Sequence, residues 1–342
     1  MTAVFCRNAA DRKAETWEER LAPFDRLEFA VSDGAKGIAK AVARVARSRR
    51  DDPSAPALDH GLDVFHTAME AHRVLARHWR RAEAAWEEAE AADEKVTGAR
   101  RHGVDARGAA GAARAAWGKA IASFAQVERL EAAWGRAHAA LGLFCPDGRL
   151  NDRPRAEAEI ASAVKGLVGP DWSKVRNALD DPRSLSFLDR MHRRLESAEP
   201  RPEWREAMAW RWWLRHRRPP SSAPLTRLIQ AVGRDHVLNE SERTSHDLVA
   251  AVLGDTFRAS SAVECMNSVL RMQQSRHKRM TQPMLDLKRL YWNCHPFRSG
   301  PRKDACPYRA LGLELPRFDF WTLLQADPGD LTQTLSTARK AE

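Results

Sequence analysis

The spacing of hydrophobic residues predicts a mostly helical chain. Between Ala68 and about Thr256, apolar residues recur at steps of three and four, which is the helical period. The two longest patterns cover 68–96 and 117–141, and we expect these helices to pack as an antiparallel hairpin. The break between them is rich in glycine: Gly98, Gly103, Gly108 and Gly111. Shorter helical patterns follow around 156–167, 172–179, 185–195, 202–217, 226–237 and 242–253.

Strand patterns are confined to the beginning of the chain. Residues 1–6 have strand composition, and a short amphipathic helix is expected within 11–24. The segment Arg26–Ser32 is apolar and alternating, which predicts a strand. It ends at Asp33, and a glycine turn then leads into a helix through about Arg47. An acid directly after a strand lies at the carboxyl edge of a sheet, where α/β folds bind ligands, although Asp33 also fits a turn or a helix cap.

A second acid stands apart from its surroundings near the C-terminal end. Glu264 lies near the start of a predicted helix whose other exposed side chains are mostly basic or amide. Apolar residues from Val263 onward recur at helical spacing, and Glu264, Asn267 and Arg271 fall on one stripe. This pattern fits a carboxylate presented to a ligand. Ser261-x-x-Glu264 equally fits a capping box, in which both side chains bind amides at the helix start.

Three segments at this end of the chain resemble a known family. The run Arg258–Arg271 is followed by Leu287–Asn293 and by Pro307–Gly312. Together they resemble the C-terminal end of bacterial insertion-sequence transposases of the DDE type. The resemblance implies that Glu264 is the last of three metal-binding carboxylates. Asp33, in the pattern Ser-Asp-Gly-x-x-Gly, is similar to the second aspartate of these enzymes, which is also a metal ligand.

The resemblance extends to residues that would support the metal ligands. Leu62–His66 looks like the short strand that follows the second aspartate in transposases with a helical insertion. Asp63 and His66 are therefore expected to hold the ligands in place, and Asn267 is assigned the same role. By itself, the spacing Asp-x-x-His also fits a surface turn.

The fold that the resemblance implies is mostly α with a small α/β part. We expect an incomplete RNase H-like sheet domain, made of 1–67 and 257–310, in which 257–310 carries the glutamate helix and a basic segment. A large all-helical insertion covers 68–256, and a peripheral helical tail covers 311–342. The family's first catalytic aspartate has no counterpart in this sequence. We therefore expect an N-terminally truncated, inactive transposase fragment whose sheet has an open edge.

The chemistry implied by the resemblance is metal-dependent DNA cleavage and strand transfer at transposon ends. Two Mg²⁺ or Mn²⁺ ions held by carboxylates would activate the attacking oxygen and neutralise the leaving one. Asp33 and Glu264 are the residues expected to be both catalytic and metal-binding. With the third carboxylate missing, we expect the two ions to be held poorly.

Basic residues are concentrated in the C-terminal third. The formal net charge is +10, and residues 201–310 contain twenty Lys and Arg against ten Asp and Glu, so this segment alone matches the whole excess. Such a patch suits double-stranded DNA, here transposon ends and target, although a solvated basic face is the alternative. The residues expected to contact DNA are Arg258, Arg271, Arg276, Lys278, Arg279, Lys288, Arg289, Arg298, Arg302 and Lys303.

Two other functional classes fit the same sequence. One is a non-catalytic DNA-binding or regulatory helical protein, in which Glu264 is only a cap. The other is a helical scaffold that self-associates through the 68–141 hairpin, so a homo-oligomer is also possible. Most of the twelve tryptophans fit helix cores, whereas Trp210, Trp212 and Trp213, which stand among arginines, fit either burial or stacking on nucleic acid.

Cysteine usage and hydropathy give the expected compartment. The five cysteines are widely spread and form no Cys-x-x-Cys pair, which argues against a disulfide framework or a structural zinc site. No apolar run approaches the roughly 18–20 residues needed to span a bilayer, and the N-terminus lacks a signal-peptide core. We expect a cytoplasmic, nucleoid-associated bacterial protein with no membrane partner.

Overall fold

The computed structural model describes most of the helical region and parts of both ends of the chain. The described residues are 11–52, 55–216, 238–256, 258, 281–296, 303–310, 319–327 and 330. They divide into two compact units, one of residues 24–259 and one of residues 1–23 together with 260–342. The described residues are mostly helical and include a small parallel sheet, which confirms the predicted fold class at this level. The predicted division into four domains stays a prediction, and the strand expected at 1–6 lies outside the described residues.

The sheet of the 24–259 unit is a βαβ arrangement. Strands β1 (Phe29–Ser32) and β2 (Asp59–Leu62) pair in parallel, and α2 (Lys36–Arg50) connects them. The register places the last residues of the two strands, Ser32 and Leu62, opposite each other. The carboxyl ends of both strands therefore meet at one edge.

Both strand predictions needed correction at their ends. The strand expected from Arg26 begins only at Phe29, because the chain turns just before it: the N–H of Leu27 donates to the carbonyl of Phe24 at 3.1 Å. Arg49 Nη1 also donates to the carbonyl of Leu27 (2.5 Å). The expectation that Leu62–His66 is a strand is wrong. β2 ends at Leu62, and Asp63 caps the helix that begins at the next residue.

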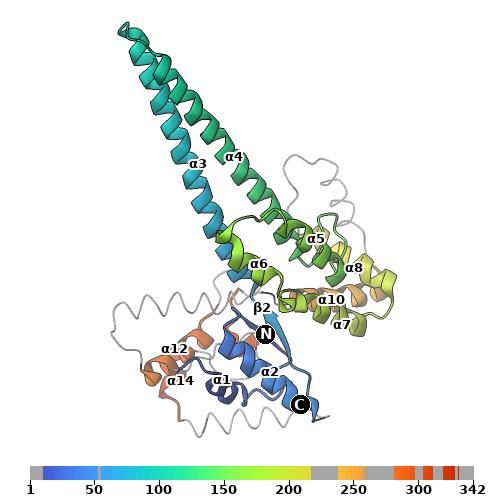
Figure 1. Ribbon diagram of the computed structural model, residues 1–342. Helices are drawn as coiled ribbons and strands as arrows, with labels where there is room; N and C mark the ends of the chain where they lie inside the picture. The colour runs from blue at the N-terminus through green and yellow to red at the C-terminus, as the bar shows by residue number, and fades with distance from the viewer. Residues whose placement is uncertain are drawn as a thin grey trace. The chain divides into compact units, whose positions relative to one another are not determined.

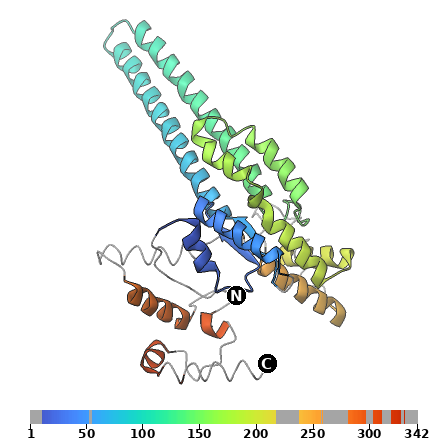
Figure 2. The ribbon, with the colours of Figure 1, turned by 60° about the horizontal axis from the view of Figure 1, so that its bottom comes forward.

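The two long helices form the antiparallel hairpin that the sequence predicts. α3 (Val64–Arg101) and α4 (Arg107–Ala140) lie side by side along their length (Figure 1, Figure 2). Aromatic rings join them: Trp79 meets Phe124 edge to face, with ring centroids 5.7 Å apart, and Trp86 meets Trp117 in the same way. The helical spacing of these tryptophans thus reflects packing between the helices.

The glycine-rich break is shorter than the sequence suggests. Gly98 lies inside α3, and Gly108 and Gly111 lie inside α4, so only residues 102–106 connect the helices. Glycine in a helix interior costs up to about 1 kcal/mol relative to alanine, and the extensive packing of two long helices outweighs this cost. Gly103, at φ +68°, is the glycine that the turn requires.

Shorter helices pack around the base of the hairpin and share one hydrophobic core. They are α5 (Arg153–Val164), α6 (Ser173–Leu179), α7 (Ser186–Ala198), α8 (Pro202–His216) and α10 (Glu240–Gly254), with 3₁₀ turns η1 (Pro170–Trp172) and η2 (Pro182–Leu185). Trp172, Phe187 and Met191 are among the largest fully buried side chains of this core. The structure confirms these predicted helices to within a few residues, whereas the helix expected at 226–237 lies outside the described residues.

The tryptophans of α8 pack against a turn of the same unit. Trp212 stacks on Phe144, with centroids 5.7 Å apart and ring planes 13° apart. Trp210 and Trp213 cover Gly148, whose φ of +88° and lack of a side chain allow this close approach. The contacts favour burial over nucleic-acid stacking for this group, although Trp210 stays 39% exposed.

The described part of the other unit consists of four helices. They are α1 (Ala14–Leu21), α12 (Gln282–Cys294), α13 (Pro307–Ala310) and α14 (Phe320–Gln325). α12 packs against α13 and α14. The predicted short N-terminal helix is confirmed by α1. Of the predicted helical tail at 311–342, the structure describes residues 319–327 and 330, which include α14.

Candidate functional site at the carboxyl edge of the parallel strands

Two aspartates follow the two parallel strands directly. Asp33 comes after the last residue of β1, and Asp63 comes after the last residue of β2. The N–H of Asp63 donates to the carbonyl of Ser32 at 2.8 Å, so the strand pairing continues to the point where both acids leave the sheet. Neighbouring strands lie about 4.8 Å apart, and the backbones of the two acids are therefore close together. The structure brings together two of the residues that the sequence singled out.

Asp63 is fully buried and holds the first turn of α3. Its Oδ1 accepts a hydrogen bond from the N–H of Phe65 at 2.8 Å, which makes it the N-cap. Its Oδ2 lies 3.7 Å from His66 Nε2. Asp63 and His66 are thus in contact, as the expectation of a supporting pair requires, and the carboxylate has a structural task at the helix start.

Asp33 is exposed and lies in a tight turn. Its Oδ1 accepts a hydrogen bond from the N–H of Ala35 at 3.1 Å. The next residue, Gly34, has φ +79°, and a Cβ there would lie 2.8 Å from Leu62 Cδ1. Only glycine therefore lets the turn pass over the neighbouring strand. A carboxylate offers about four lone-pair positions, so Asp33 keeps the capacity to bind a cation while holding this turn.

A hollow of about 520 Å³ opens beside the two aspartates. Besides Asp33 and Asp63 it is lined by charged residues of both signs, which include Glu70, Arg73, Lys174, Asp181 and Arg183. Glu70 lies between two cations, 3.6 Å from Arg73 and 3.9 Å from Lys174. The hollow therefore has one exposed carboxylate, Asp33, at the strand ends and basic groups around it, a combination suited to a metal ion and a phosphate.

A hydrogen-bonded chain that sequence reasoning missed lies along the sheet beside this hollow. His60 Nε2 is 2.8 Å from Ser32 Oγ, and Arg183 Nη1 is 3.4 Å from His60 Nδ1. Arg183 also binds Asp181 with two nitrogens, which lowers the pKa of that carboxyl. Burial, helped by the Arg183 charge, lowers the pKa of His60 to about 4, so the imidazole is neutral at pH 7. Nothing in the sequence pattern links β2 to η2, and only the fold reveals this contact.

The chain returns to the same edge after the helical region. The carbonyl of Arg258 accepts a hydrogen bond from the N–H of Val64 at 2.9 Å, so the residue that starts α3 is bound to the segment leading toward Glu264. Arg258 Nη1 donates to the carbonyl of Leu141 at 2.8 Å, just after α4. Arg258 therefore anchors the return of the chain, and its expected contact with DNA stays a prediction.

Several of the predicted site residues lie outside the described residues: Glu264, Asn267, Arg271, Arg276, Lys278, Arg279, Arg298 and Arg302. Of the remaining basic candidates, Lys288 and Arg289 lie on α12, where Arg289 is 3.4 Å from Asp286, and Lys303 is exposed. Within the described residues no group of three or more His, Cys, Asp or Glu is arranged to hold a metal ion. The metal pair at Asp33 and Glu264 stays a prediction.

Comparisons with known proteins return no match. No family model matches the chain, and no curated protein and no solved structure matches it. The resemblance to transposases stands on the residues quoted from the sequence. No helix in the described ranges is long and apolar enough to cross a membrane.

Proposed function

We propose that this chain is a DNA-transposition protein of the DDE type, whose reaction is metal-dependent cleavage and strand transfer of DNA. Its catalytic domain would be an RNase H-like sheet into which the helical segment 68–256 is inserted. One observation carries the proposal: the hydrogen bond from Val64 to Arg258 joins the two ends of the helical segment beside Asp63. An insertion has to leave and re-enter its host domain at neighbouring points, and these two residues meet that requirement.

The same hydrogen bond bears on the wide separation of the two catalytic acids along the chain. Asp33 directly follows the carboxyl end of β1. The carbonyl of Arg258 accepts a hydrogen bond from the N–H of Val64, two residues after the carboxyl end of the neighbouring strand β2. Glu264 follows Arg258 by six residues in the sequence and lies outside the described residues.

The donor set at this edge suits a hard divalent cation. Mg²⁺ and Mn²⁺ prefer carboxylate oxygen, and Mg²⁺ uses few protein ligands because it keeps several waters. Asp33 supplies an exposed carboxylate, and Asp63 holds the backbone next to it. When bound, a metal pair would polarise the phosphodiester and activate the attacking oxygen. Arg73 and Lys174, which line the hollow, are placed to attract the phosphate.

Titration with Mn²⁺ in the presence of a 30-base-pair duplex tests the metal site in the full chain. Removing one of a few carboxylate ligands while keeping its shape should weaken binding, so Asp33→Asn and Glu264→Gln should each lower the Mn²⁺ affinity about 10-fold or more. Asp25→Asn, at an exposed aspartate outside the hollow, is the matched control and should leave the affinity unchanged.

Nicking of supercoiled plasmid in Mg²⁺ gives the second readout. Any cleavage by the chain should disappear in Asp33→Asn and in Glu264→Gln and persist in Asp25→Asn. Duplex binding should weaken with salt on a log–log slope of about −0.9 per phosphate contact, and it should survive both site substitutions. Unchanged Mn²⁺ affinity in both site variants, with duplex binding intact, would refute the transposase assignment and leave a non-catalytic DNA-binding protein.

A further inference from the structure

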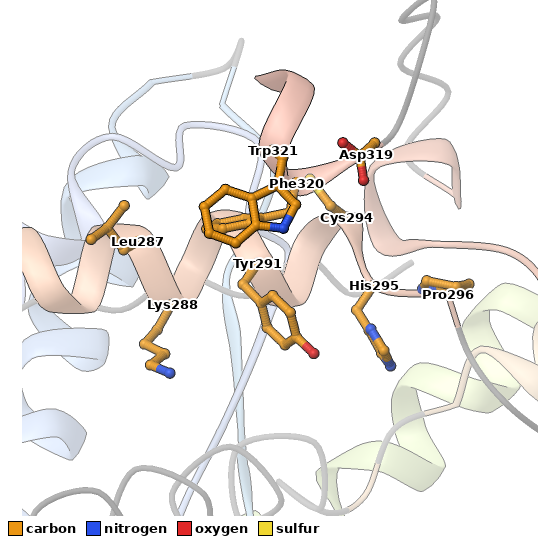
Figure 3. Close-up of a pocket in the computed structure, with 9 residues that line it drawn as sticks. All are labelled: Leu287, Lys288, Tyr291, Cys294, His295, Pro296, Asp319, Phe320 and Trp321. Atoms are coloured by element: carbon orange, nitrogen blue, oxygen red, sulfur yellow. The ribbon is translucent and has the colours of Figure 1, made fainter. Parts of the chain in front are cut away.

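An aromatic hollow lies on the unit that contains α12, α13 and α14. It has a volume of about 480 Å³ and is lined from α12 and from the start of α14. Figure 3 shows Lys288, Tyr291 and His295 projecting to the same side of α12, with Phe320 and Trp321 beside them. These side chains belong to two helices that are separated by more than twenty residues of sequence, and the fold gathers them in one place.

The rings of this hollow hold one another in position. Tyr291 and His295 stack with centroids 5.4 Å apart and planes 25° apart, and Phe320 meets Tyr291 edge to face at 5.6 Å. Trp321 in turn meets Phe320 edge to face at 5.0 Å. Despite these contacts, Tyr291 stays 41% exposed and Trp321 stays 65% exposed. Large aromatic surface is thus fixed by neighbours and presented to solvent, which lowers the entropy lost when a flat ligand binds.

The hollow is lined by one cation and one carboxylate. Lys288 brings an ammonium group to the hollow. Asp319, the carboxylate at the other side, is engaged as the N-cap of α14, where it accepts hydrogen bonds from the N–H and hydroxyl of Thr322. Cys294 adds no negative charge, because burial, with Cys306 and Asp319 nearby, raises the pKa of its thiol to about 11.

We propose that this aromatic hollow binds an unpaired nucleobase of single-stranded DNA, with Lys288 facing its phosphate. Flat π surface beside a single cation is the combination that proteins use for single strands, because every base has a face to stack and every nucleotide carries a charge. An apolar peptide would match the rings but would leave Lys288 without a counter-charge. The choice of DNA over RNA rests on the function proposed above, in which DNA strands are cleaved and transferred.

Fluorescence anisotropy with the full chain and a labelled thymidine oligomer of about 12 nucleotides tests this site. Stacking on an aromatic side chain is worth about a 5- to 150-fold change in affinity per base by alanine substitution, so Trp321→Ala and Tyr291→Ala should each weaken binding by a factor in that range. Tyr291→Phe keeps the ring and should retain the affinity. Lys288→Gln should reduce the salt slope by about 1.

Two controls separate stacking from general effects. Leu324→Ala removes a 40%-exposed side chain of the same helix that does not line the hollow, and it should leave binding unchanged. An oligomer of equal length made of abasic residues should bind weakly to the native protein and should be insensitive to Trp321→Ala. Equal affinity for thymidine and abasic oligomers overturns the proposal and points to an apolar protein contact instead.

The test also separates this inference from the proposed function. Unchanged thymidine-oligomer binding in Trp321→Ala and Tyr291→Ala, with normal Mn²⁺ binding at Asp33 and Glu264, overturns the stacking site alone. In the converse result, Trp321→Ala and Tyr291→Ala weaken oligomer binding as expected, but Asp33→Asn and Glu264→Gln leave the Mn²⁺ affinity unchanged. That result overturns the transposition proposal alone.

Discussion

Replacing Asp63 separates its role at the helix start from the role proposed for it beside a metal site. The side chain is fully buried, caps α3 through the N–H of Phe65 and contacts His66. Asn is as good an N-cap as Asp but carries no charge, whereas Ala removes the cap altogether. Asp63→Asn therefore tests the charge, and Asp63→Ala tests the charge and the cap together.

The expected magnitudes follow from this geometry. Loss of an N-cap costs about 0.5–2 kcal/mol, and the complete burial of Asp63 places Asp63→Ala in the upper half of that range. For a unit of this size, 1 kcal/mol corresponds to about 2–4 °C in Tm, so Asp63→Ala should lower Tm by roughly 3–8 °C. Asp63→Asn should change Tm by less than about 2 °C, because the cap is kept. If the carboxylate supports the metal ligands, Asp63→Asn should still lower the Mn²⁺ affinity about 10-fold.

Thermal unfolding followed by circular dichroism, together with Mn²⁺ titration, measures both effects. Asp152 provides the matched control: it is the N-cap of α5, accepts from the N–H of Arg155 at 2.9 Å and does not line the hollow at the strand ends. Asp152→Ala should lose stability in the lower half of the same range of about 0.5–2 kcal/mol, because Asp152 is partly exposed, and it should leave Mn²⁺ affinity unchanged. The capping argument fails if Asp63→Asn unfolds as early as Asp63→Ala. The supporting role fails if Asp63→Asn binds Mn²⁺ as tightly as the native chain.

Two further predictions concern stability. Gly148→Ala should lower the free energy of unfolding by about 1–3 kcal/mol, because φ is +88° and the new Cβ would lie 2.8 Å from the Trp213 ring. Gly111→Ala, inside α4 and with open space around the new Cβ, should instead raise the free energy of unfolding by about 0.5–1 kcal/mol. The pKa of His60 is lowered from 6.5 to about 4, so between these pH values the unfolded chain binds more protons and acid favours unfolding. Tm should therefore fall between pH 7 and pH 4.5, and it should fall less in His60→Gln; identical pH profiles would contradict the burial of a neutral imidazole.

Local sequence patterns predicted much of the fold because helices depend on contacts between near neighbours. The steps of three and four that bring Trp79 and Trp86 onto one face are visible in the sequence, and these residues form the hairpin interface with Trp117 and Phe124. The strand ending at Asp33 was recognisable for the same reason, since alternation and the following Asp-Gly turn are local signals. Asp33 was singled out because it follows this pattern and because its surroundings resemble a transposase segment, whereas Asp63 was singled out by the resemblance of Leu62–His66 alone.

Other features depended on contacts that no local pattern encodes. The sequence of residues 63–66 does not distinguish the end of a strand from the start of a helix. In the structure, the pairing of β2 with β1 ends at Leu62, and residues 64–66 begin α3. The chain from Arg183 to His60 and Ser32 joins segments far apart in sequence, so its hydrogen bonds exist only in the folded unit.

The sequence by itself determined the helical hairpin, the first strand with the helix that follows it, and the positions of the acids along the chain, because these follow from periodicity and turn chemistry within a few residues. Only the tertiary structure decided that Asp33 and Asp63 share one sheet edge, that Arg258 returns to it, and that Tyr291 and Trp321 flank one hollow. The physical reason is that hydrogen bonding and packing between distant segments select one register and one pairing from many that the local patterns allow.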